Sequence, residues 1–267
     1  MARLSISKAW DETKVVIAQS GNLIVAVGLA LLVLPGVVAG LVQPQPTPGE
    51  LPPAGPWMAL MLAALLIGMV GQLAIVRLAL GSGVSVGEAL AHAARRFLPF
   101  LGAVLLVIIP FLILVSVLAA MIGTDPEQAN AAATLVLLLV LIGMIYVLIR
   151  LLLMAPVATA ESIGPVEIVK RSWQLTRGNW WRLFAFFLLL IIAGSILVLA
   201  VGTIMGTIVG LVSDGTIEPM SVGALVVGLV TQVVATALTI VFMVMLARMY
   251  LQVAGGHAHV SVPSSAD

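Results

Sequence analysis

Basic and tryptophan residues are concentrated in one short stretch of an otherwise apolar chain. Residues 170–183, KRSWQLTRGNWWRL, hold four of the twelve Lys and Arg and three of the five Trp. Arginines interleaved with aromatic side chains can bind a nucleic acid through phosphate contacts and base stacking, or line a catalytic loop. A nucleic-acid surface would need many more cations and a water-exposed domain, whereas the net charge is only +1, so we expect no nucleic-acid partner.

The composition indicates that this stretch lies in a membrane protein. Hydrophobic residues make up 62% of the chain and the mean hydropathy is +1.24, whereas soluble domains average about 45–50% apolar residues. A water-soluble fold of 267 residues could not bury that much apolar surface. The chain has no cysteine, which excludes disulfides and thiolate metal sites.

Six apolar segments are each near or above the ~20 residues that a helix needs to cross a bilayer. Backbone groups in hydrocarbon must pair within their own segment, so the spans are helices. We therefore predict an all-α polytopic membrane protein with one membrane domain over residues 1–256 and a flexible C-terminal tail over residues 257–267. The spans are expected at residues 22–42, 57–80, 98–122, 131–150, 183–212 and 221–248.

The distribution of cations predicts the orientation. All twelve Lys and Arg fall on one side of the six spans, and the connections on the other side, residues 43–56, 123–130 and 213–220, contain none. By the positive-inside rule both termini are cytoplasmic. The first apolar run has span length and lacks a small-residue cleavage site, so it is not a cleavable signal. We expect a multi-pass protein of the bacterial inner membrane.

The chain also shows a threefold internal similarity. Each unit, at about residues 5–80, 85–158 and 164–251, is a short amphipathic interfacial helix followed by two spans. Spans two, four and six end in Arg-Leu-Ala-Leu, Arg-Leu-Leu-Leu and Arg-Met-Tyr-Leu. Spans one, three and five each carry helix-loosening residues at mid-span. These are Pro35, Pro110 and Gly194-Ser195.

The interfacial helices have recognisable ends and faces. Ser85 and Glu88 have the spacing of a capping box, and Pro165 and Gly178 suit the start and end of the third helix. In that helix Glu167, Lys170, Arg171, Gln174 and Arg177 share one arc, opposite Val166, Ile168, Val169, Trp173 and Leu175. We expect the cations to face headgroups and Trp173 to face acyl chains. Trp180, Trp181 and Arg182 would anchor the fifth span.

The span-ending arginines Arg77, Arg150 and Arg248 are the main candidates for binding. They could anchor the spans by extending to phosphate groups, or form a site for lipid headgroups or another anion. The basic and tryptophan residues of the third interfacial helix and the start of span five are the other headgroup or interface candidates: Lys170, Arg171, Arg177, Arg182, Trp173, Trp180 and Trp181.

Small and polar residues within the spans predict helix packing. Spaced glycines let helices approach closely, within the chain or in a homo-oligomer; these are Gly36, Gly40, Gly202, Gly206 and Gly210. The polar side chains at depth are expected to form interhelical hydrogen bonds rather than line a substrate path; they are Gln72, Thr231, Gln232 and Thr236. No acidic residue lies near mid-membrane, which argues against an ordinary proton- or sodium-coupled transporter.

Catalytic constellations are absent from the sequence. His92 is expected on an exposed helix face, and His257 and His259 in the tail would supply only half of a typical metal site. No base–nucleophile pair, phosphate-binding loop or dinucleotide fingerprint is found. We predict no enzymatic activity, no metal and no cofactor.

Residues 165–182, PVEIVKRSWQLTRGNWWR, carry a family resemblance. The proline, the Ser-Trp-x-Leu-Thr-x-Gly motif and the aromatic–Arg start of the next span resemble the glycerophosphoryl diester phosphodiesterase membrane-domain family. In some members of that family the membrane region is fused to a soluble phosphodiesterase barrel with metal-binding acids and catalytic histidines. The resemblance implies a stand-alone membrane module here, and no catalytic residue carries over.

The leading prediction is therefore a non-catalytic integral membrane protein that serves as an anchoring or accessory module in envelope or lipid homeostasis. Its interfacial helices would engage anionic lipid headgroups or a protein partner in the cytoplasm or membrane. The alternatives are a small lipid or hydrophobic-solute transporter and, more distantly, a membrane-bound phosphodiesterase. Membrane lipids are the expected partners, and the sequence leaves open whether the chain forms a homo-oligomer.

Overall fold

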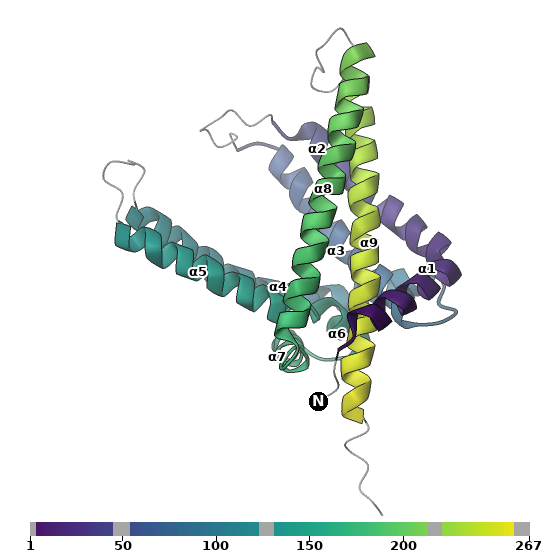
Figure 1. Cartoon of the computed structure of the whole chain (residues 1–267), viewed down its shortest axis with the longest axis vertical. Coiled ribbons are helices and arrows are strands. Elements are labelled where there is room, and N and C mark those ends of the chain that lie inside the picture. Colours follow the sequence, from purple (N-terminus) through teal and green to yellow (C-terminus); the bar gives the residue numbers. More distant parts are fainter. Residues whose placement is uncertain (1–3, 45–53, 123–130, 213–220, 259–267) are drawn as a thin grey trace, which may run out of the picture.

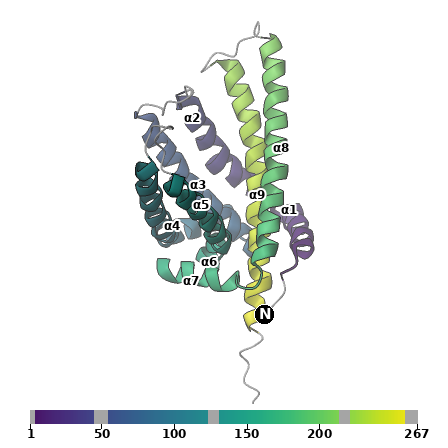
Figure 2. The same ribbon diagram turned by 60° about the vertical axis from the view of Figure 1, so that its left-hand side comes forward.

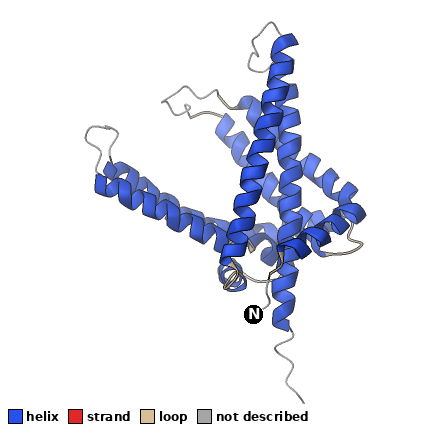
Figure 3. Cartoon of the chain, viewed as in Figure 1, coloured by secondary structure: helices blue, strands red, loops and turns tan. Residues whose placement is uncertain are grey.

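The structure is a computed structural model that describes residues 4–44, 54–122, 131–212 and 221–258. In these ranges the chain forms helices and short connections and no strand (Figure 3). Six helical segments are long and apolar enough to cross a membrane, which confirms the all-helical class and the six candidate spans. The helices are α1 (Ile6–Gly28), the π-helical turn η1 (Leu29–Val33), α2 (Leu34–Val42), α3 (Trp57–Leu80), α4 (Val86–Ile122), α5 (Ala131–Arg150), α6 (Met154–Ala160), α7 (Pro165–Leu175), α8 (Trp180–Val212) and α9 (Val222–Ala258).

The helices form three hairpins that diverge from a common base (Figure 1). Helices α2 and α3 form one hairpin, α4 and α5 the second, and α8 and α9 the third. The short helix α7 lies across the base beneath the hairpins, as the turned view shows (Figure 2). The start of α1 and the end of α9 also lie at the base (Figures 1 and 2). The described Lys and Arg belong to α1, to α7 and the turn that follows it, or to the parts of α3, α4, α5, α8 and α9 that converge on this base.

The hydrophobic core is in the base rather than along the hairpins. Leu73 and Ile75 of α3, Leu153 before α6, and Leu246 and Met249 of α9 are fully buried there. Large apolar side chains of the hairpin arms are instead exposed; on α5 and α8 they include Leu135, Leu139, Ile142, Leu189, Ile196 and Leu199. Lipid tails are as apolar as these side chains, so exposure in the arms costs little in a bilayer. Protein packing therefore determines the geometry of the base.

Two of the expected interfacial helices continue into the spans that follow them. α1 and α4 each run from the base into a hairpin without an intervening loop. The predicted capping box is confirmed at the start of α4, where Ser85 N donates to Glu88 Oε2 at 2.9 Å and Glu88 N donates to Ser85 Oγ at 3.2 Å. The predicted loosening at Pro35 coincides with a π-helical turn directly before α2. Pro110, in contrast, lies inside the continuous helix α4.

The end of the fourth span differs from the ends of the second and sixth. Arg77 and Arg248 lie within α3 and α9, whereas Arg150 is the last residue of α5. A turn and the short helix α6 follow, and Leu153 through Thr159 are all buried. The sequence pattern did not predict α6. The threefold repeat therefore stays a prediction, and the expected tail, residues 257–267, lies almost wholly outside the described residues.

Candidate functional site

A basic cavity lies between the last turn of α3 and the first turns of α4. It has a volume of about 410 Å³, and Arg77, Glu88, His92 and Arg95 supply its polar lining. The capping box sets the direction of α4, which carries three of these four side chains. Gly83, with φ of +73°, makes the tight connection from α3. Local sequence features therefore place four ionisable groups around one cavity.

The cavity has an excess of hydrogen-bond donors over free acceptors. Glu88 Oε2 already accepts from the Ser85 amide and from Ser85 Oγ at 3.0 Å. Arg95 uses Nε to bond the carbonyl of Ala91 at 3.2 Å, which leaves its terminal nitrogens. Arg77 has no hydrogen bond or ion pair within the described part of the chain. Two guanidinium groups facing one engaged carboxylate suit an anion such as a phosphate.

His92, predicted on an exposed helix face, is instead half-buried. Its Nε2 lies 2.8 Å from the carbonyl oxygen of Thr159, at the end of α6. Arg96, one turn further along α4, is half-buried too. It donates to the carbonyls of Ala158 at 2.7 Å, Glu161 at 2.6 Å and Ile163 at 2.9 Å. The exposed position expected for His92 was wrong because the acceptors on this face of α4 belong to a segment 62 to 67 positions away.

The Ser-Trp-x-Leu-Thr-x-Gly motif clamps the end of α5. Ser172 Oγ donates to the carbonyl oxygen of Arg150 at 3.1 Å, and Thr176 Oγ1 lies 3.0 Å from that oxygen and equally close to the Ser172 carbonyl of its own helix. The last carbonyls of a helix lack partners within the helix, so these hydroxyls satisfy one that would otherwise be buried unpaired. Leu175 is 1% exposed beneath the clamp, and Gly178 adopts φ of +85° in the turn before α8. The motif therefore has a structural role at this position.

The guanidinium of Arg150 is enclosed by aromatic side chains. Its carbon Cζ lies 5.3 Å from the ring centroid of Tyr146 and 5.1 Å from that of Trp173. Nη2 also donates to the Tyr146 hydroxyl at 2.8 Å. Trp180 extends the aromatic cluster by donating from Nε1 to the Tyr146 carbonyl at 3.3 Å and stacking on Phe184. This arginine is thus largely occupied by protein contacts, except for Nη1, which is buried without a hydrogen bond.

Arg248 occupies a third kind of environment. Its Nη2 donates to the carbonyl oxygen of Ala79, in the last turn of α3, at 2.6 Å. The three span-ending arginines therefore do not share one site: Arg77 lines the basic cavity, Arg150 is stacked, and Arg248 caps a helix. Of the three, Arg77 alone has its whole guanidinium available within the described residues.

Glu161 links the elements of the base. Its Oε1 accepts from Arg171 Nε at 3.0 Å and from the Tyr250 hydroxyl at 2.9 Å. The Arg171 and Glu161 side chains are 32% and 24% exposed, so the ion pair is only partly screened by solvent. The network joins α7, the α6–α7 connection and α9. Arg171 is accordingly tied into the protein, although the helical wheel placed it with the headgroup-facing cations.

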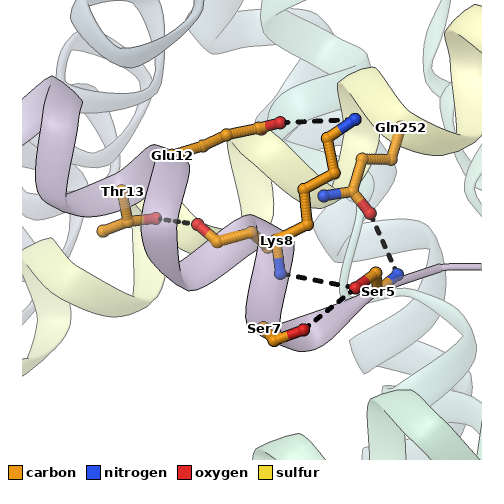
Figure 4. Close-up of polar contacts among 7 residues, drawn as sticks. Ser5, Ser7, Lys8, Glu12, Thr13 and Gln252 are labelled. Atoms are coloured by element: carbon orange, nitrogen blue, oxygen red, sulfur yellow. Dashed lines mark hydrogen bonds and ion pairs between the residues drawn. The ribbon is translucent and has the colours of Figure 1, made fainter.

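The N-terminal segment is also tied into the base. Ser5 N donates to Gln252 Oε1 of α9 at 3.0 Å, and Lys8 and Glu12 form an ion pair at 3.8 Å (Figure 4). Arg182, at the start of α8, donates from Nη1 to the carbonyl of Leu4 at 2.7 Å. The predicted anchor Arg182 thus also fixes the chain that precedes α1.

The remaining predicted interface residues are on the surface. Lys170 and Arg177 are exposed and have no side-chain partner within the described residues. Trp181 is 74% exposed and Trp173 is 38% exposed. All four side chains are exposed enough to contact lipid headgroups, and that predicted role stays a prediction.

The predicted packing glycines divide into two groups. A Cβ on Gly36 would lie 2.5 Å from Nε2 of Gln232, and one on Gly202 would lie 3.7 Å from Thr231 Oγ1. A Cβ on Gly40, Gly206 or Gly210 would meet nothing within 4 Å. A further tight contact between helices is at Gly71, which the sequence did not single out and where a Cβ would lie 2.9 Å from Leu31 Cβ.

No group of three or more His, Asp or Glu side chains within the described ranges could hold a metal ion. The predicted tail residue His259 and the side chain of His257 lie outside the described residues. The acidic residues of the connections that lack Lys and Arg, such as Glu50 and Asp125, lie outside them as well.

Comparison with known protein families gives a match over most of the chain. A family model with the description domain of unknown function, DUF7847, matches residues 4–253. No curated protein and no solved structure matches the chain. The matched range includes all six candidate spans up to residue 253 and every residue of the basic cavity.

Proposed function

The chain belongs to the DUF7847 family, and on that premise we propose that it is a non-catalytic integral membrane protein whose base binds anionic lipid headgroups. In this role it is an anchoring or accessory module in the envelope of a bacterial cell, at the inner membrane. The proposed binding site for the headgroup is the basic cavity that Arg77 lines.

The observation that supports it most directly is the guanidinium of Arg77 in the basic cavity, which is attracted by Glu88 but makes no hydrogen bond or close ion pair with a described residue. Arg77 and Arg95 supply parallel N–H donors that match the oxygens of a phosphate. Juxtamembrane basic residues gain about 1 kcal/mol each near an anionic leaflet. Exposed Lys170 and Arg177 lie on the same base and would add a less specific attraction.

The proposed orientation places this base in the cytoplasmic leaflet. All described cations converge on it, and the positive-inside rule assigns such a face to the cytoplasm. Both termini would then be cytoplasmic, because α1 begins and α9 ends at the base (Figure 1).

Native mass spectrometry of protein released from nanodiscs of equal phosphatidylglycerol and phosphatidylethanolamine tests the headgroup site. We expect the wild-type protein to retain phosphatidylglycerol preferentially, and the variant Arg77→Gln/Arg95→Gln to retain at least about fivefold less, on the scale of 1 kcal/mol per cation. Lys14→Gln, which removes an exposed cation that is already paired with Asp11 on α1, is the matched control. Equal retention by the double variant would refute the site, and the same spectra count the chains per particle and so test a homo-oligomer.

A transporter of small lipids or hydrophobic solutes is a second candidate function. The π-helical turn η1, which ends two residues before Pro35, and the divergence of the hairpins in Figure 1 favour it, because π-helical turns inside helices are frequent at functional sites. Lipid scrambling or solute flux in proteoliposomes would support this function.

The relationship with the glycerophosphoryl diester phosphodiesterase membrane-domain family is also a proposal. It rests on residues 165–182, whose motif clamps α5 through Ser172 and Thr176. A membrane-bound phosphodiesterase is the most distant candidate function. Hydrolysis of glycerophosphodiesters by the purified chain would establish it and overturn the non-catalytic proposal.

A further inference from the structure

Two adjoining cavities lie between α2, α3 and α9, in the half of the spans away from the base. The larger, about 740 Å³, lies between α2 and the start of α9. The other, about 410 Å³, extends between η1, α2, α3 and α9. Both are lined by Gly36, Gly40, Gln43 and Gln232, so they share a wall. Such volumes are typical of sites for small organic ligands.

The larger cavity exists because the glycine-containing faces of α2 and α9 do not pack against each other. Gly40 of α2 and Gly228 of α9 both line the larger cavity, and a Cβ on either would meet nothing within 4 Å. Facing glycines in a membrane usually allow helices to close on each other. Here the Gln232 side chain fills the approach at Gly36, and the helices remain separated beyond it.

The polar lining of the cavities is neutral and has unused hydrogen-bonding capacity. Thr231 also lines the larger cavity, but its Oγ1 is buried without a hydrogen bond and lies 3.7 Å from the point where a Cβ on Gly202 of α8 would be. No hydrogen bond joins Gln72 or Gln232 to another described residue. Each amide offers two donors and one acceptor, and leaving such groups unmatched in a low-dielectric region is costly. The lining therefore calls for a ligand that both donates and accepts.

The lack of charge in the lining restricts the ligand class. No Lys, Arg, His, Asp or Glu of the described residues lines either cavity, so a charged headgroup would lose its hydration without an opposite charge. Apolar side chains such as Leu31, Leu32 and Leu65 line the rest of the smaller cavity. Leu65 is also 60% exposed on the lipid-facing side of α3, which connects the cavity with the acyl-chain region.

We propose that these adjoining cavities bind a neutral, hydroxyl-bearing lipid, with its head at the amides of Gln72 and Gln232 and its chain along the apolar wall. An alcohol hydroxyl donates to an amide oxygen and accepts from an amide N–H, which fits this lining. The site is separate from the basic cavity, with which it shares no lining residue.

Photo-crosslinking tests the proposal with a monoacylglycerol that carries a diazirine in its chain, added to protein in nanodiscs. We expect labelled peptides from residues 29–44 and 222–240, and competition by unlabelled monoacylglycerol. Gln232→Leu removes the shared amide and should lower labelling there about tenfold, the effect of losing one to two hydrogen bonds. Thr207→Val, which removes an exposed hydroxyl of α8 that bonds its own helix, is the control and should leave labelling unchanged.

A cavity-filling variant separates binding from folding. Gly228→Leu retains every polar group and has room for its side chain, so the protein should fold and labelling should fall. Gly206→Leu, equally unobstructed on α8, should label like the wild type. Labelling spread evenly over α4, α5 and α8, insensitivity to both cavity variants, or equal labelling by a diazirine phosphatidylglycerol would overturn the proposal.

Discussion

The guanidinium of Arg248 donates a hydrogen bond of 2.6 Å to the carbonyl oxygen of Ala79, which lies 169 positions earlier in the chain. A residue of the sixth span thus caps the C-terminal end of the second span by donating to one of its last carbonyls. Arg96 does the same for α6, and Ser172 and Thr176 do so for α5. The helix ends of the base are capped by side chains from other helices, which makes the base the part of the molecule most sensitive to substitution.

Replacing Arg248 tests this arrangement. Arg248→Gln should lower the free energy of unfolding by about 1 to 3 kcal/mol, because the Ala79 carbonyl loses a charged donor. Unfolding in mixed dodecyl sulfate micelles, followed by circular dichroism, gives the value. Arg177→Gln removes an exposed arginine without a described partner and should change stability by less than about 0.5 kcal/mol. Equal effects of the two variants would contradict the capping role.

The Glu161–Arg171 ion pair should be energetically coupled. Both side chains are partly buried and Nε lies 3.0 Å from Oε1, so a double-mutant cycle of Glu161→Gln and Arg171→Gln should give a coupling near the upper end for exposed pairs, about 1 kcal/mol. The exposed pair Lys14–Asp11 on α1, at 2.7 Å, is the comparison and should show about half of that or less. A coupling that is larger for the α1 pair would be inconsistent with the structural network around Glu161.

The capping box of α4 predicts a local effect. Ser85→Ala removes the acceptor for Glu88 N and should cost about 1 kcal/mol at the start of α4. Hydrogen exchange should therefore speed up about fivefold for the amides of residues 86–90, with no change in α9. Ser82→Ala, in the exposed connection before the helix, is the matched serine variant and should leave exchange as it is.

Two glycines on different helices should respond in different ways to the same substitution. A Cβ on Gly71 would lie 2.9 Å from Leu31 Cβ, which is fixed to its backbone, so Gly71→Ala forces η1 and α3 apart. We expect a loss of about 1 to 3 kcal/mol, as for other overpacked sites. Gly143→Ala, on α5, meets nothing within 4 Å and should be neutral or slightly stabilising. Comparable losses in thermal stability at both positions would show that the α3–η1 contact is looser than described.

The orientation can be measured with single cysteines, because the native chain has none. Ser221→Cys lies at the tip of the α8–α9 hairpin and Ser82→Cys lies at the base. In intact spheroplasts, a membrane-impermeant maleimide should label Cys at position 221 directly and Cys at position 82 only after permeabilisation. The reverse pattern would place the basic face outside and overturn the positive-inside assignment.

The sequence alone determined the class of fold and the ends of several helices. Six spans were predictable because hydropathy, bilayer thickness and backbone pairing act within a single segment. The Ser85–Glu88 cap and Pro165 at the start of α7 were predictable for the same reason, since their partners lie within one turn. The sequence did not predict that α1 and α4 continue into the following spans without a loop. Nothing in their composition marks whether an interfacial helix ends before its span or runs on into it.

The tertiary structure decided which polar groups are free and which are engaged. Arg77, Arg150 and Arg248 end their spans in similar motifs, yet one lines a cavity, one stacks on Trp173 and one caps α3. Hydropathy periodicity records only whether a side chain prefers water or lipid. It carries no information about a carbonyl acceptor supplied by another helix, or about whether two glycine faces meet or leave a cavity. Those outcomes depend on how three hairpins pack at one base, which is a property of the whole chain.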